Sequence, residues 1–574
     1  MTILIGWAND LDASAVLAVD GIVVGAVAEE RFTREKQQTG FPANAIQHLL
    51  DSAGLKLRDV DEWAYGWFRG DNANQLLPGL CERVARQADD RRAVEVMLTR
   101  LDTEHSRDAA IRDSGYAEAA AFGVPVDRIR AYEHHPSHAW SAFAFCPFDE
   151  ALVVTADGRG DRKSITLSRG DARGVHEFEW YSSIDSLGHI YSQVTAALGF
   201  RTNRHEGKIM GLAAHGDPSE SMPFLSELVG WSNDRIQANP GEWFIPSDSE
   251  IPPKTLERML TFKREDLAAG VQALVEDLLC RLVASRVGRT GLRRIALAGG
   301  VMANVQLNRR IRELPDVEAM FVQPNMGDGG LPLGAVAASH HRRTGQAKIR
   351  WDGMALGPGP CGESVSREPS VRFASSKSAV RWLVAQLIDF QVVGLVRGAC
   401  EFGPRALCHR SILVDASRST INNDLNRRLH RTEFMPFAPV MTDRAARLAL
   451  SGWSRDDRCA PFMTTAYVTH PDFRQGHPAV IHADGSVRPQ VITHEADPFM
   501  HAVLEEYERQ TGRVALINTS FNLHEEPIVL TIDDALRALD AGAVDAVFGE
   551  DAAWGTGAAW LADRNDGQLP KEAR

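Results

Sequence analysis

The chain between residues 151 and 158 reads Ala151-Leu152-Val153-Val154-Thr155-Ala156-Asp157-Gly158. A short apolar run that stops at a turn is typical of a buried strand. Similar runs at residues 295–298 and 319–323 also end in turns that contain Gly or Asp, and helical stretches separate all three. This alternation predicts an α/β fold, in which ligands gather where the strands end.

Two histidines precede this strand. The stretch His134-His135-Pro136-Ser137-His138 places His134 and His138 four residues apart, so that both imidazoles share one face of a helix. A carboxylate at the end of a buried strand, such as Asp157, needs a partner. Two histidines and a carboxylate suit iron, zinc or another divalent metal, and Asp328 in a later turn can complete the set. The alternative is a structural histidine pair beside a turn.

The overall composition is that of a globular protein. The chain has 574 residues, of which 44% are hydrophobic and 24% charged, so we expect more than one domain. A formal net charge of −13 disfavours a dedicated nucleic-acid binder. No apolar run is long enough to span a membrane, and no signal peptide precedes the first strand-like residues. Seven scattered cysteines without a Cys-x-x-Cys pair argue against disulfides, so we expect a cytoplasmic protein.

The pattern along the chain indicates two α/β domains. Val16 to Val27 reads as a hairpin around Asp20-Gly21, and residues 75–130 read as helices with a solvated face. Between residues 346 and 372 the periodicity fades around prolines and glycines, which predicts domains at 1–350 and 365–574. The second domain contains strand-like runs near Val392–Val396 and Val514–Ile517. No internal repeat is visible in the sequence.

Several turns have the composition of ligand-binding loops. Asp12-Ala13-Ser14 lies near the first strand, and Lys208 lies among small residues between 206 and 216. Gly299 and Gly300 follow a strand and open a helix together with Asn304, so the backbone N–H groups there can hold a phosphate. Each of these signals is weak alone, because Gly-Gly and Asp-containing turns are common.

Their order along the chain resembles the carbamoyltransferase family of nodulation factors and antibiotics, which includes the nebramycin carbamoyltransferase type. In the first domain the resemblance rests on Asp12-Ala13-Ser14, Glu29 to Arg34, His134 to His138, Asp157-Gly158, Glu206 to Gly216, Gly299-Gly300-Val301 and Asp328. In the second domain it rests on Gly403-Pro404-Arg405-Ala406-Leu407, Pro436-Phe437-Ala438-Pro439, Arg488-Pro489-Gln490 and Asn518-Thr519-Ser520-Phe521-Asn522. The resemblance covers nearly the whole chain.

The resemblance implies two active sites. The N-terminal domain is expected to be an actin-like ATPase domain, similar to the tRNA threonylcarbamoyladenosine synthase, and the C-terminal domain to be a YrdC-like α/β domain. The implied metal ligands, for Fe²⁺ or another divalent ion, are His134, His138, Asp157 and Asp328. The implied adenylate contacts are Lys208, Gly299, Gly300 and Asn304. The implied contacts to carbamoyl phosphate and nucleotide in the second domain are Arg405, Arg410, Arg488, Asn518, Ser520 and Asn522.

The implied reaction makes carbamoyladenylate from carbamoyl phosphate and ATP with Mg²⁺, then transfers the carbamoyl group to a secondary-metabolite hydroxyl or amine. Arginines suit the clamping of these anionic substrates. The adenylate is prone to hydrolysis, so we expect it to pass internally to the first domain. There a metal can polarise the carbamoyl oxygen. The expected catalytic residues are Asp12, Lys208 and Arg405.

Two positions depart from the family pattern. Family members usually carry a His directly before the Asp-Ala-Ser segment, where this chain has Leu11. Asn9 or Asp12 could compensate, so no general base is assigned. Before Pro436, where the family often has an arginine, this chain has Met435, and Arg431 is the expected substitute.

Three alternatives remain open. A tRNA threonylcarbamoylation enzyme would need a basic RNA-binding surface, which the net charge disfavours. A hydrogenase-maturation carbamoyltransferase would bring zinc modules that the sequence does not show. An actin-like nucleotide-binding regulator would have lost catalysis, as Leu11 allows. We expect the acceptor to contact residues 217–265, with Trp231, Trp243 and Phe244, or residues 75–120. A homodimer is a reasonable expectation.

Overall fold

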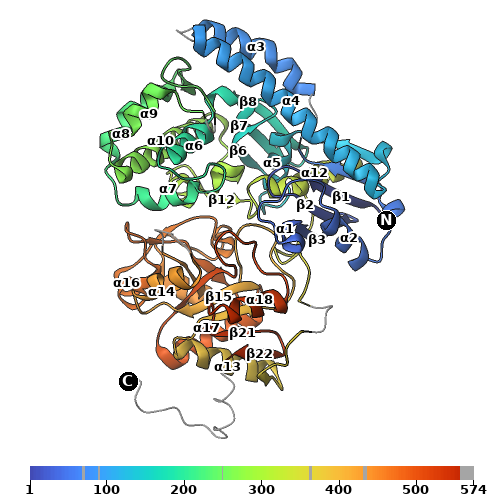
Figure 1. Ribbon diagram of the computed structural model, residues 1–574, viewed down its shortest axis with the longest axis vertical. Coiled ribbons are helices and arrows are strands. Elements are labelled where there is room, and N and C mark those ends of the chain that lie inside the picture. Colours follow the sequence, from blue (N-terminus) through green and yellow to red (C-terminus); the bar gives the residue numbers. More distant parts are fainter. Residues whose placement is uncertain (68–70, 88–90, 248–249, 361–364, 431–435, 556–574) are drawn as a thin grey trace.

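The structure is a computed structural model that describes residues 1–67, 71–87, 91–247, 250–360, 365–430 and 436–555. The chain before residue 345 forms the upper part of the molecule in Figure 1, and the chain after residue 370 forms the lower part. The upper part contains two separate sheets, whereas a larger sheet organises the lower part.

The first sheet has the strand order β3-β2-β1-β4-β5. Its strands are β1 (Ile3–Ala8), β2 (Ser14–Val19), β3 (Ile22–Ala28), β4 (Glu62–Tyr65) and β5 (Ile129–Ala131). β1 pairs antiparallel with β2 and parallel with β4. The predicted hairpin is confirmed, because Asp20 and Gly21 join β2 to β3 with positive φ angles of 49° and 74°, as a two-residue turn of the hairpin type requires.

The second sheet repeats this topology, with the order β12-β11-β6-β7-β8. Its strands are β6 (Ala151–Gly160), β7 (Lys163–Asp171), β8 (Gly174–Ser182), β11 (Arg294–Ala298) and β12 (Ala319–Val322). β6 pairs antiparallel with β7 and parallel with β11, as β1 does with β2 and β4. No repeat is visible in the amino-acid sequence, yet the strand order is duplicated. Strand order and direction can be duplicated while the side chains differ.

Helices α5 (His134–Phe143) and α12 (Leu331–Thr344) lie between the two sheets. α5 packs on β6 and β11, α12 packs on β1 and β4, and the two helices pack on each other. Their close approach depends on Gly334 of α12, since a Cβ there would overlap the backbone carbonyl of Ser137. This packing fixes α5, which carries both candidate histidine ligands, against the end of β6.

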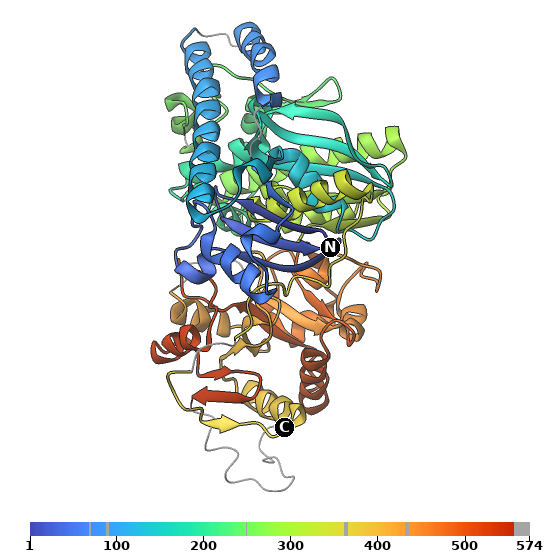
Figure 2. The same cartoon turned by 90° about the vertical axis from the view of Figure 1, so that its right-hand side faces the viewer.

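Other elements surround these sheets. The remaining helices of the upper part are α1 (Glu30–Thr33), α2 (Ala43–Ser52), α3 (Asp71–Gln87), α4 (Arg91–Phe122), α6 (Leu187–Ala197), α7 (Glu206–Ala213), α8 (Pro218–Leu228), α9 (Pro253–Met259), α10 (Arg264–Thr290) and α11 (Val305–Arg312). β9 (Val229–Ser232) and β10 (Arg235–Ala238) form a small hairpin. The long pair α3 and α4 crosses the top of the molecule in Figures 1 and 2, where helices were predicted for residues 75–130.

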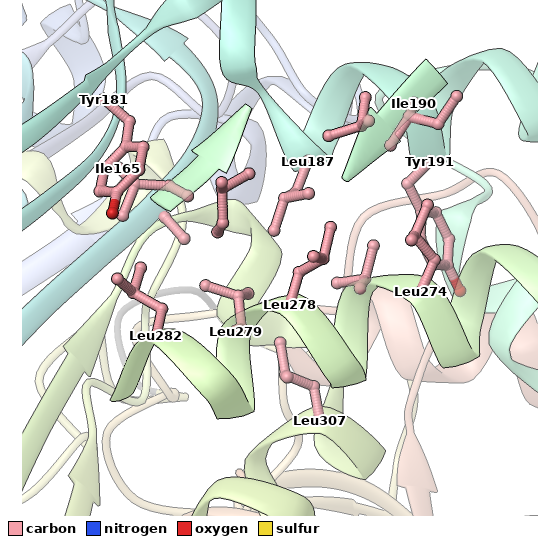
Figure 3. Packing of buried hydrophobic residues seen from close by; sticks show 14 of the residues in the cluster. Ile165, Tyr181, Leu187, Ile190, Tyr191, Leu274, Leu278, Leu279, Leu282 and Leu307 are labelled. Carbon is pink, nitrogen blue, oxygen red and sulfur yellow. The ribbon is translucent and has the colours of Figure 1, made fainter. Parts of the chain in front are cut away.

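The largest apolar core of the upper part lies around α10. Leu274, Leu278 and Leu282 recur every four residues and are buried on one face of this helix. Figure 3 shows them packed against Ile190 of α6 and Leu307 of α11, among other residues. This core holds the second sheet and its helices as one rigid support for the end of β6.

The lower part has a mixed sheet with the order β13-β22-β21-β14-β15-β20-β16-β19. Its strands are β13 (Val371–Arg372), β14 (Val393–Val396), β15 (Arg410–Asp415), β16 (Ala438–Thr442), β19 (Gln490–Ile492), β20 (Ala515–Ser520), β21 (Ala546–Phe548) and β22 (Ala552–Gly555). Its helices are α13 (Ser376–Ile388), α14 (Ile421–Arg428), α15 (Asp443–Ala449), α16 (Pro471–Gly476), α17 (Pro498–Thr511) and α18 (Ile532–Asp540). β17 (Tyr467–Val468) and β18 (Ser486–Val487) form a separate pair.

The two parts are joined by polar contacts. Arg34 donates to the carbonyl oxygens of Ile528 at 2.7 Å and Pro527 at 2.8 Å. Asn308 donates to the carbonyl of Thr464 at 2.7 Å, and Arg204 pairs with Glu525 at 2.5 Å. The upper and lower parts therefore meet along several elements, as Figure 2 also shows.

The predicted α/β class is confirmed for both parts of the chain, and the duplicated sheets of the upper part are those of an actin-like domain. The strands predicted near Val392–Val396 and Val514–Ile517 correspond to β14 and β20. The exact division at 1–350 and 365–574 stays a prediction. Within the described residues, no helix has the length and apolar character that a membrane span requires.

Candidate active site

The two histidines of α5 converge on one point. Their Nε2 atoms lie 3.1 Å apart, and both side chains are almost completely buried. The helix can begin at His134 with a proline as its third residue, because Pro136 falls in the first turn, where its missing N–H is not needed. The backbone N–H of His134 donates to the carboxyl group of Asp161, which satisfies one of the donors at the start of the helix.

Two carboxylates complete the cluster. Asp157 lies near the end of β6, and Asp328 opens the short 3₁₀ helix η5 (Asp328–Gly330) after β12. His138 Nε2 lies 3.3 Å from Asp157 Oδ2 and 3.4 Å from Asp328 Oδ1. The corresponding distances from His134 Nε2 are 3.9 and 3.6 Å. The structure thus brings together the four predicted metal ligands, with one ligand atom of each within 4.8 Å of the others.

The distances between the ligand atoms of the cluster suit a single divalent cation. Nitrogen and oxygen ligands lie about 2.0–2.2 Å from zinc, so ligand atoms about 3 Å apart can share one ion. Asp328 Oδ1 is buried and faces the Nε2 atoms of His134 and His138 at 3.6 and 3.4 Å. Two backbone donors fix the carboxylate of Asp157, since the N–H groups of Gly158 and Gly300 each donate to it at 2.6 Å. The donor set of two imidazoles and two carboxylates suits iron, zinc or manganese.

The electrostatics of the cluster favour positive charge at its centre. Burial alone would lower the pKa of His138, but hydrogen bonds and charge interactions with Asp157 and Asp328 raise that pKa to about 9. Burial would raise the pKa of Asp157, but His134 and His138 hold it well below its ordinary value. The carboxylates that stabilise a protonated imidazole would equally stabilise a metal ion in its place.

Glycines next to the cluster set its packing. A Cβ on Gly160 would overlap the imidazole ring of His134. Gly299 has a φ angle of 101°, and a Cβ there would overlap the backbone of Ala156. The predicted contacts of Gly299 and Gly300 with adenylate stay predictions. In the structure the N–H of Gly300 donates to Asp157, and Gly299 lies against the backbone of Ala156.

Lys208 and Asn304 are the two other residues predicted to contact adenylate. Lys208 is buried on α7, with its Nζ 5.9 Å from the ring centre of Phe200. The side chain of Asn304 accepts a hydrogen bond from the N–H of Leu307 at 3.1 Å and exchanges hydrogen bonds with Gln272. Asn304 is therefore the N-cap of α11, and its contact with adenylate stays a prediction.

The loop between β1 and β2 brings two carboxylates toward Asp328. Asp12 has a φ angle of 61° and lies beside Gly329. Burial, then the charges of Glu30 and Asp328, raise the pKa of Asp12 to about 7. Asn9, the other suggested substitute for the missing histidine, is already occupied, since it donates to Ile111 and accepts from Tyr65, each at 2.8 Å. Asp10 was not singled out from the sequence.

Two arginines form the core of the site in the lower part. Arg405 and Arg488 have no ion pair with any described residue. Burial lowers the pKa of Arg405 to about 10, and burial together with the charge of Arg405 lowers that of Arg488 well below its ordinary value. Two neighbouring, half-buried guanidinium groups without a carboxylate repel each other, and an anion bound between them would relieve this repulsion.

Polar residues of β20 lie near this arginine pair. Asn518 Nδ2 donates to Gln490 Oε1 at 2.6 Å and to the carbonyl of Ala406, next to Arg405, at 3.1 Å. Ser520 donates to Asn522 Oδ1 at 2.6 Å, and Asn522 in turn donates to backbone carbonyls of Leu523 and Glu526. These side chains build the loop beside the arginines, and their contacts with a nucleotide stay predictions.

The geometry favours a structural role for Arg410. Its guanidinium is fully buried and donates to the carbonyl oxygens of Leu530, Arg397, Gly398, His409 and Pro358. A guanidinium whose donors are already used has little capacity for a phosphate. The predicted substitute residue Arg431 lies outside the described residues.

Arg405 lies at the boundary between the two parts. Arg405 Nη2 contacts the carbonyl of Ala303 at 3.4 Å, in the 3₁₀ helix η4 (Gly300–Ala303) whose first N–H binds Asp157. Gly403 lies against Asn325, and Arg31 donates to the Gly403 carbonyl at 3.3 Å. A chain of direct contacts therefore connects the two predicted sites.

Comparison with known proteins identifies both parts of the chain. Residues 6–337 match the family model described as the carbamoyltransferase N-terminus, and residues 384–554 match the carbamoyltransferase C-terminus. The nodulation protein NolNO of Sinorhizobium fredii is 31% identical over 92% of this chain and 76% of its own. Nodulation protein U of Rhizobium tropici is 26% identical over 94% of this chain and 93% of its own. A solved structure of HypF from T. kodakarensis aligns with a TM-score of 0.32 and 14% identity, covering 60% of this chain and 48% of that chain.

Proposed function

The chain belongs to the carbamoyltransferase family and is a carbamoyltransferase, and we propose that it draws its carbamoyl group from carbamoyl phosphate and ATP through a carbamoyladenylate. The observation that carries this proposal is the arginine pair Arg405 and Arg488, which lacks a carboxylate partner among the described residues. Carbamoyl phosphate and ATP are the kind of anions that two desolvated guanidinium groups bind.

In the lower part, water would release inorganic phosphate from carbamoyl phosphate, and the carbamate so formed would attack the α-phosphorus of ATP and displace pyrophosphate. The arginines would hold the phosphate groups during both steps. Positioning and charge neutralisation can supply most of that rate enhancement. Mg²⁺ would accompany the ATP. The contact between Arg405 and Ala303 supports transfer of the adenylate toward η4 without passage through bulk water.

In the upper part, His134, His138, Asp157 and Asp328 would hold Fe²⁺ or another divalent ion. When bound, such an ion supplies Lewis acidity toward a carbonyl oxygen. Gly158 and Gly300 fix the orientation of Asp157 through their N–H groups, and Asp161 fixes His134. Lys208, Gly299 and Asn304 would line the adenylate, with Asp12 on the side of the lower part. The acceptor is proposed to be a hydroxyl or amine of a secondary metabolite, including an antibiotic.

The test is a reaction of metal-loaded protein with ATP and labelled carbamoyl phosphate, followed by measurement of pyrophosphate and AMP. We expect pyrophosphate that depends on carbamoyl phosphate. The Arg488→Ala variant should form it about 100-fold more slowly, as is typical when one preorganised charged group is removed. The matched control is Arg372→Ala, an exposed arginine of β13. No pyrophosphate from the wild type, or an equal loss in both variants, would contradict the proposal.

A further inference from the structure

The motif Glu29 to Arg34 belongs to the family pattern but supplies no ligand atom to the metal cluster or the arginine pair. It consists of the short helix α1 (Glu30–Thr33) and the residue on each side. In Figure 1, α1 lies at the lower edge of the upper part, next to the lower part. Both arginines of the motif, Arg31 and Arg34, donate hydrogen bonds to the lower part.

Arg31 holds the loop that carries Arg405. Its side chain is buried, and its Nη2 donates to the carbonyl of Gly403 at 3.3 Å. Gly403 has a φ angle of 133°, which residues with a side chain rarely adopt, and an added Cβ would lie 3.3 Å from the Cβ of Asn325. Gly403 is thus held between two residues of the upper part, and it precedes Arg405 by two positions. The position of this loop therefore depends on α1.

Arg34 holds a second loop of the lower part. Its guanidinium donates to the carbonyl oxygens of Ile528 at 2.7 Å and Pro527 at 2.8 Å. This loop follows β20 and carries Asn522, whose Nδ2 donates to the carbonyl of Glu526 at 3.1 Å. Two hydrogen bonds from one planar guanidinium fix the loop in both distance and orientation. The two arginines therefore contact two loops that carry predicted ligand residues.

The second loop has another anchor in the upper part. Arg204, two residues before α7, pairs with Glu525 at 2.5 Å. Gln37, in the segment after α1, donates to the carbonyl of Asn203 at 3.2 Å. The segments after α1 and before α7 are therefore joined to each other and to the same loop of the lower part.

Toward the upper part, α1 is bonded to the loop beside the metal cluster. The N–H of Glu29 donates to the carbonyl of Ala13 at 2.8 Å. The hydroxyl group of the next residue, Ser14, donates to the carbonyl of Gly329 at 2.9 Å, and Gly329 directly follows the predicted ligand Asp328. A run of hydrogen bonds and chain connections thus leads from the turn at Asp328 through α1 to both loops of the lower part.

We propose that Arg31 and Arg34 are positioning residues, which align the arginine pair with the metal cluster so that carbamoyladenylate passes between them without entering the solvent. This role rests on the proposed function. Neither arginine has to contact the adenylate, because each acts through the loop that it holds. Transfer between two sites requires a fixed relative position, and a displacement of about 1 Å can slow a reaction about 100-fold.

Loss of this alignment has a specific chemical signature. Water attacks the carbamoyl carbon of an adenylate that escapes, the bond to the AMP oxygen breaks, AMP leaves with the electron pair, and carbamate is formed. AMP then appears in solution although no acceptor has been carbamoylated. Pyrophosphate release belongs to the preceding step and continues. An interface that only stabilised the fold would instead lose both activities together.

The test uses the full-length, metal-loaded protein without an acceptor, with carbamoyl phosphate and ATP labelled at its α-phosphorus. Rapid ultrafiltration and chromatography separate protein-bound carbamoyladenylate from free AMP, and pyrophosphate is measured in the same samples. The variants are Arg31→Met and Arg34→Met, alone and combined, which replace the guanidinium by an unbranched apolar chain. Arg58→Met is the matched control, because Arg58 is exposed and belongs to the same part.

We expect the wild type and Arg58→Met to retain carbamoyladenylate, so that free AMP lags behind pyrophosphate. The combined variant should retain at least about tenfold less and release AMP in step with pyrophosphate, which forms at a rate close to that of the wild type. Unchanged retention in this variant, or a parallel loss of pyrophosphate, would overturn the role of α1. A wild type that retains no carbamoyladenylate would also overturn it, whereas a wild type that forms no pyrophosphate would refute the proposed function.

A charge exchange decides the question if the arginine variants do not fold. Arg204→Glu places two carboxylates side by side and should release carbamoyladenylate in the same way. The double variant Arg204→Glu/Glu525→Arg restores an ion pair of reversed polarity and should recover retention. Unchanged retention in Arg204→Glu, or no recovery in the double variant, would overturn the alignment of the sites by these contacts.

Discussion

The histidine–aspartate cluster of the upper part and the arginine pair of the lower part arrange their charges in opposite ways. At the cluster, two carboxylates face two imidazoles, and the pKa of His138 rises to about 9 because a positive charge is favoured there. At the arginine pair, Arg405 and Arg488 face no described carboxylate, and their pKa values fall. The charges of the first site favour a bound cation, and those of the second favour a bound anion.

This difference explains how one chain can divide a reaction between two sites. The arginines can stabilise phosphate groups but cannot polarise a carbonyl group as a metal does. The cluster can hold a Lewis acid but would repel a phosphate unless a metal compensates its carboxylates. The contact of Arg405 with Ala303 places the two environments next to each other.

The largest effect is expected when the cation site loses its nitrogen ligands. The double variant His134→Ala/His138→Ala should bind a divalent metal more than about 100-fold more weakly, because loss of an outer partner alone costs about 10- to 100-fold. Metal content after equilibration with Fe²⁺ or Zn²⁺ measures this. The exposed His176 provides the control variant His176→Ala. Equal metal content in both variants would mean that the cluster is structural.

A smaller but substantial effect is expected from Gly160→Ala. The added methyl group would overlap the His134 imidazole, so the free energy of unfolding should fall by about 1–3 kcal/mol, the usual cost of overpacking. Metal affinity should fall with it. Gly207→Ala on α7, where a Cβ meets nothing within 4 Å, is the control. Chemical denaturation of the two variants compares them, and an unaffected Gly160→Ala would contradict the described packing of His134.

We expect Asp161 to support metal binding through the oxygen that accepts the His134 N–H, and not through a negative charge. Burial and the charge of Glu133 raise the pKa of Asp161 well above its ordinary value, which favours the neutral carboxyl group. Asp161→Asn keeps an acceptor for the His134 N–H and should retain metal affinity. Asp161→Ala removes the acceptor and should weaken metal binding about tenfold. Titration with a metal-sensitive dye distinguishes them, and equal losses in both would show that the negative charge is required.

The smallest expected effect is on the stability of the ligand-free protein. At the arginine pair a substitution should not destabilise the protein, unlike Gly160→Ala. Without ligand, Arg488→Met should leave the protein as stable as the wild type or more stable by about 1 kcal/mol, because a half-buried charge without a carboxylate partner is removed. Carbamoyl phosphate should raise the melting temperature of the wild type and not of this variant. Thermal unfolding with and without carbamoyl phosphate measures both. Marked destabilisation of the free variant would indicate that Arg488 has a structural partner.

The convergence of His134, His138, Asp157 and Asp328 can be predicted from the sequence because these residues follow local rules. His134 and His138 share a helix face at a spacing of four, and Asp157 and Asp328 each follow an apolar strand. The ends of parallel strands meet at one edge of a sheet, so these residues were expected to converge. The α/β class follows from the same alternation of strands and helices.

Other features depend on contacts that no local pattern reveals. The sequence suggests Asn9 as a substitute for the missing histidine, and only the fold shows that Tyr65 and the carbonyl of Ile111 already engage its side chain. Arg410 lies close in sequence to Arg405, but five backbone carbonyls surround it. The repeated sheet topology was missed because strand order, unlike sequence, does not require similar side chains.

The most direct test measures pyrophosphate release and carbamoyl transfer separately in two variants of the full-length protein. His138→Ala should still release pyrophosphate from ATP and carbamoyl phosphate but form no carbamoylated product. Arg488→Ala should lose both. The account would be contradicted if His138→Ala lost pyrophosphate release together with transfer, or if Arg488→Ala retained it, since neither result allows a division of labour between a cation site and an anion site.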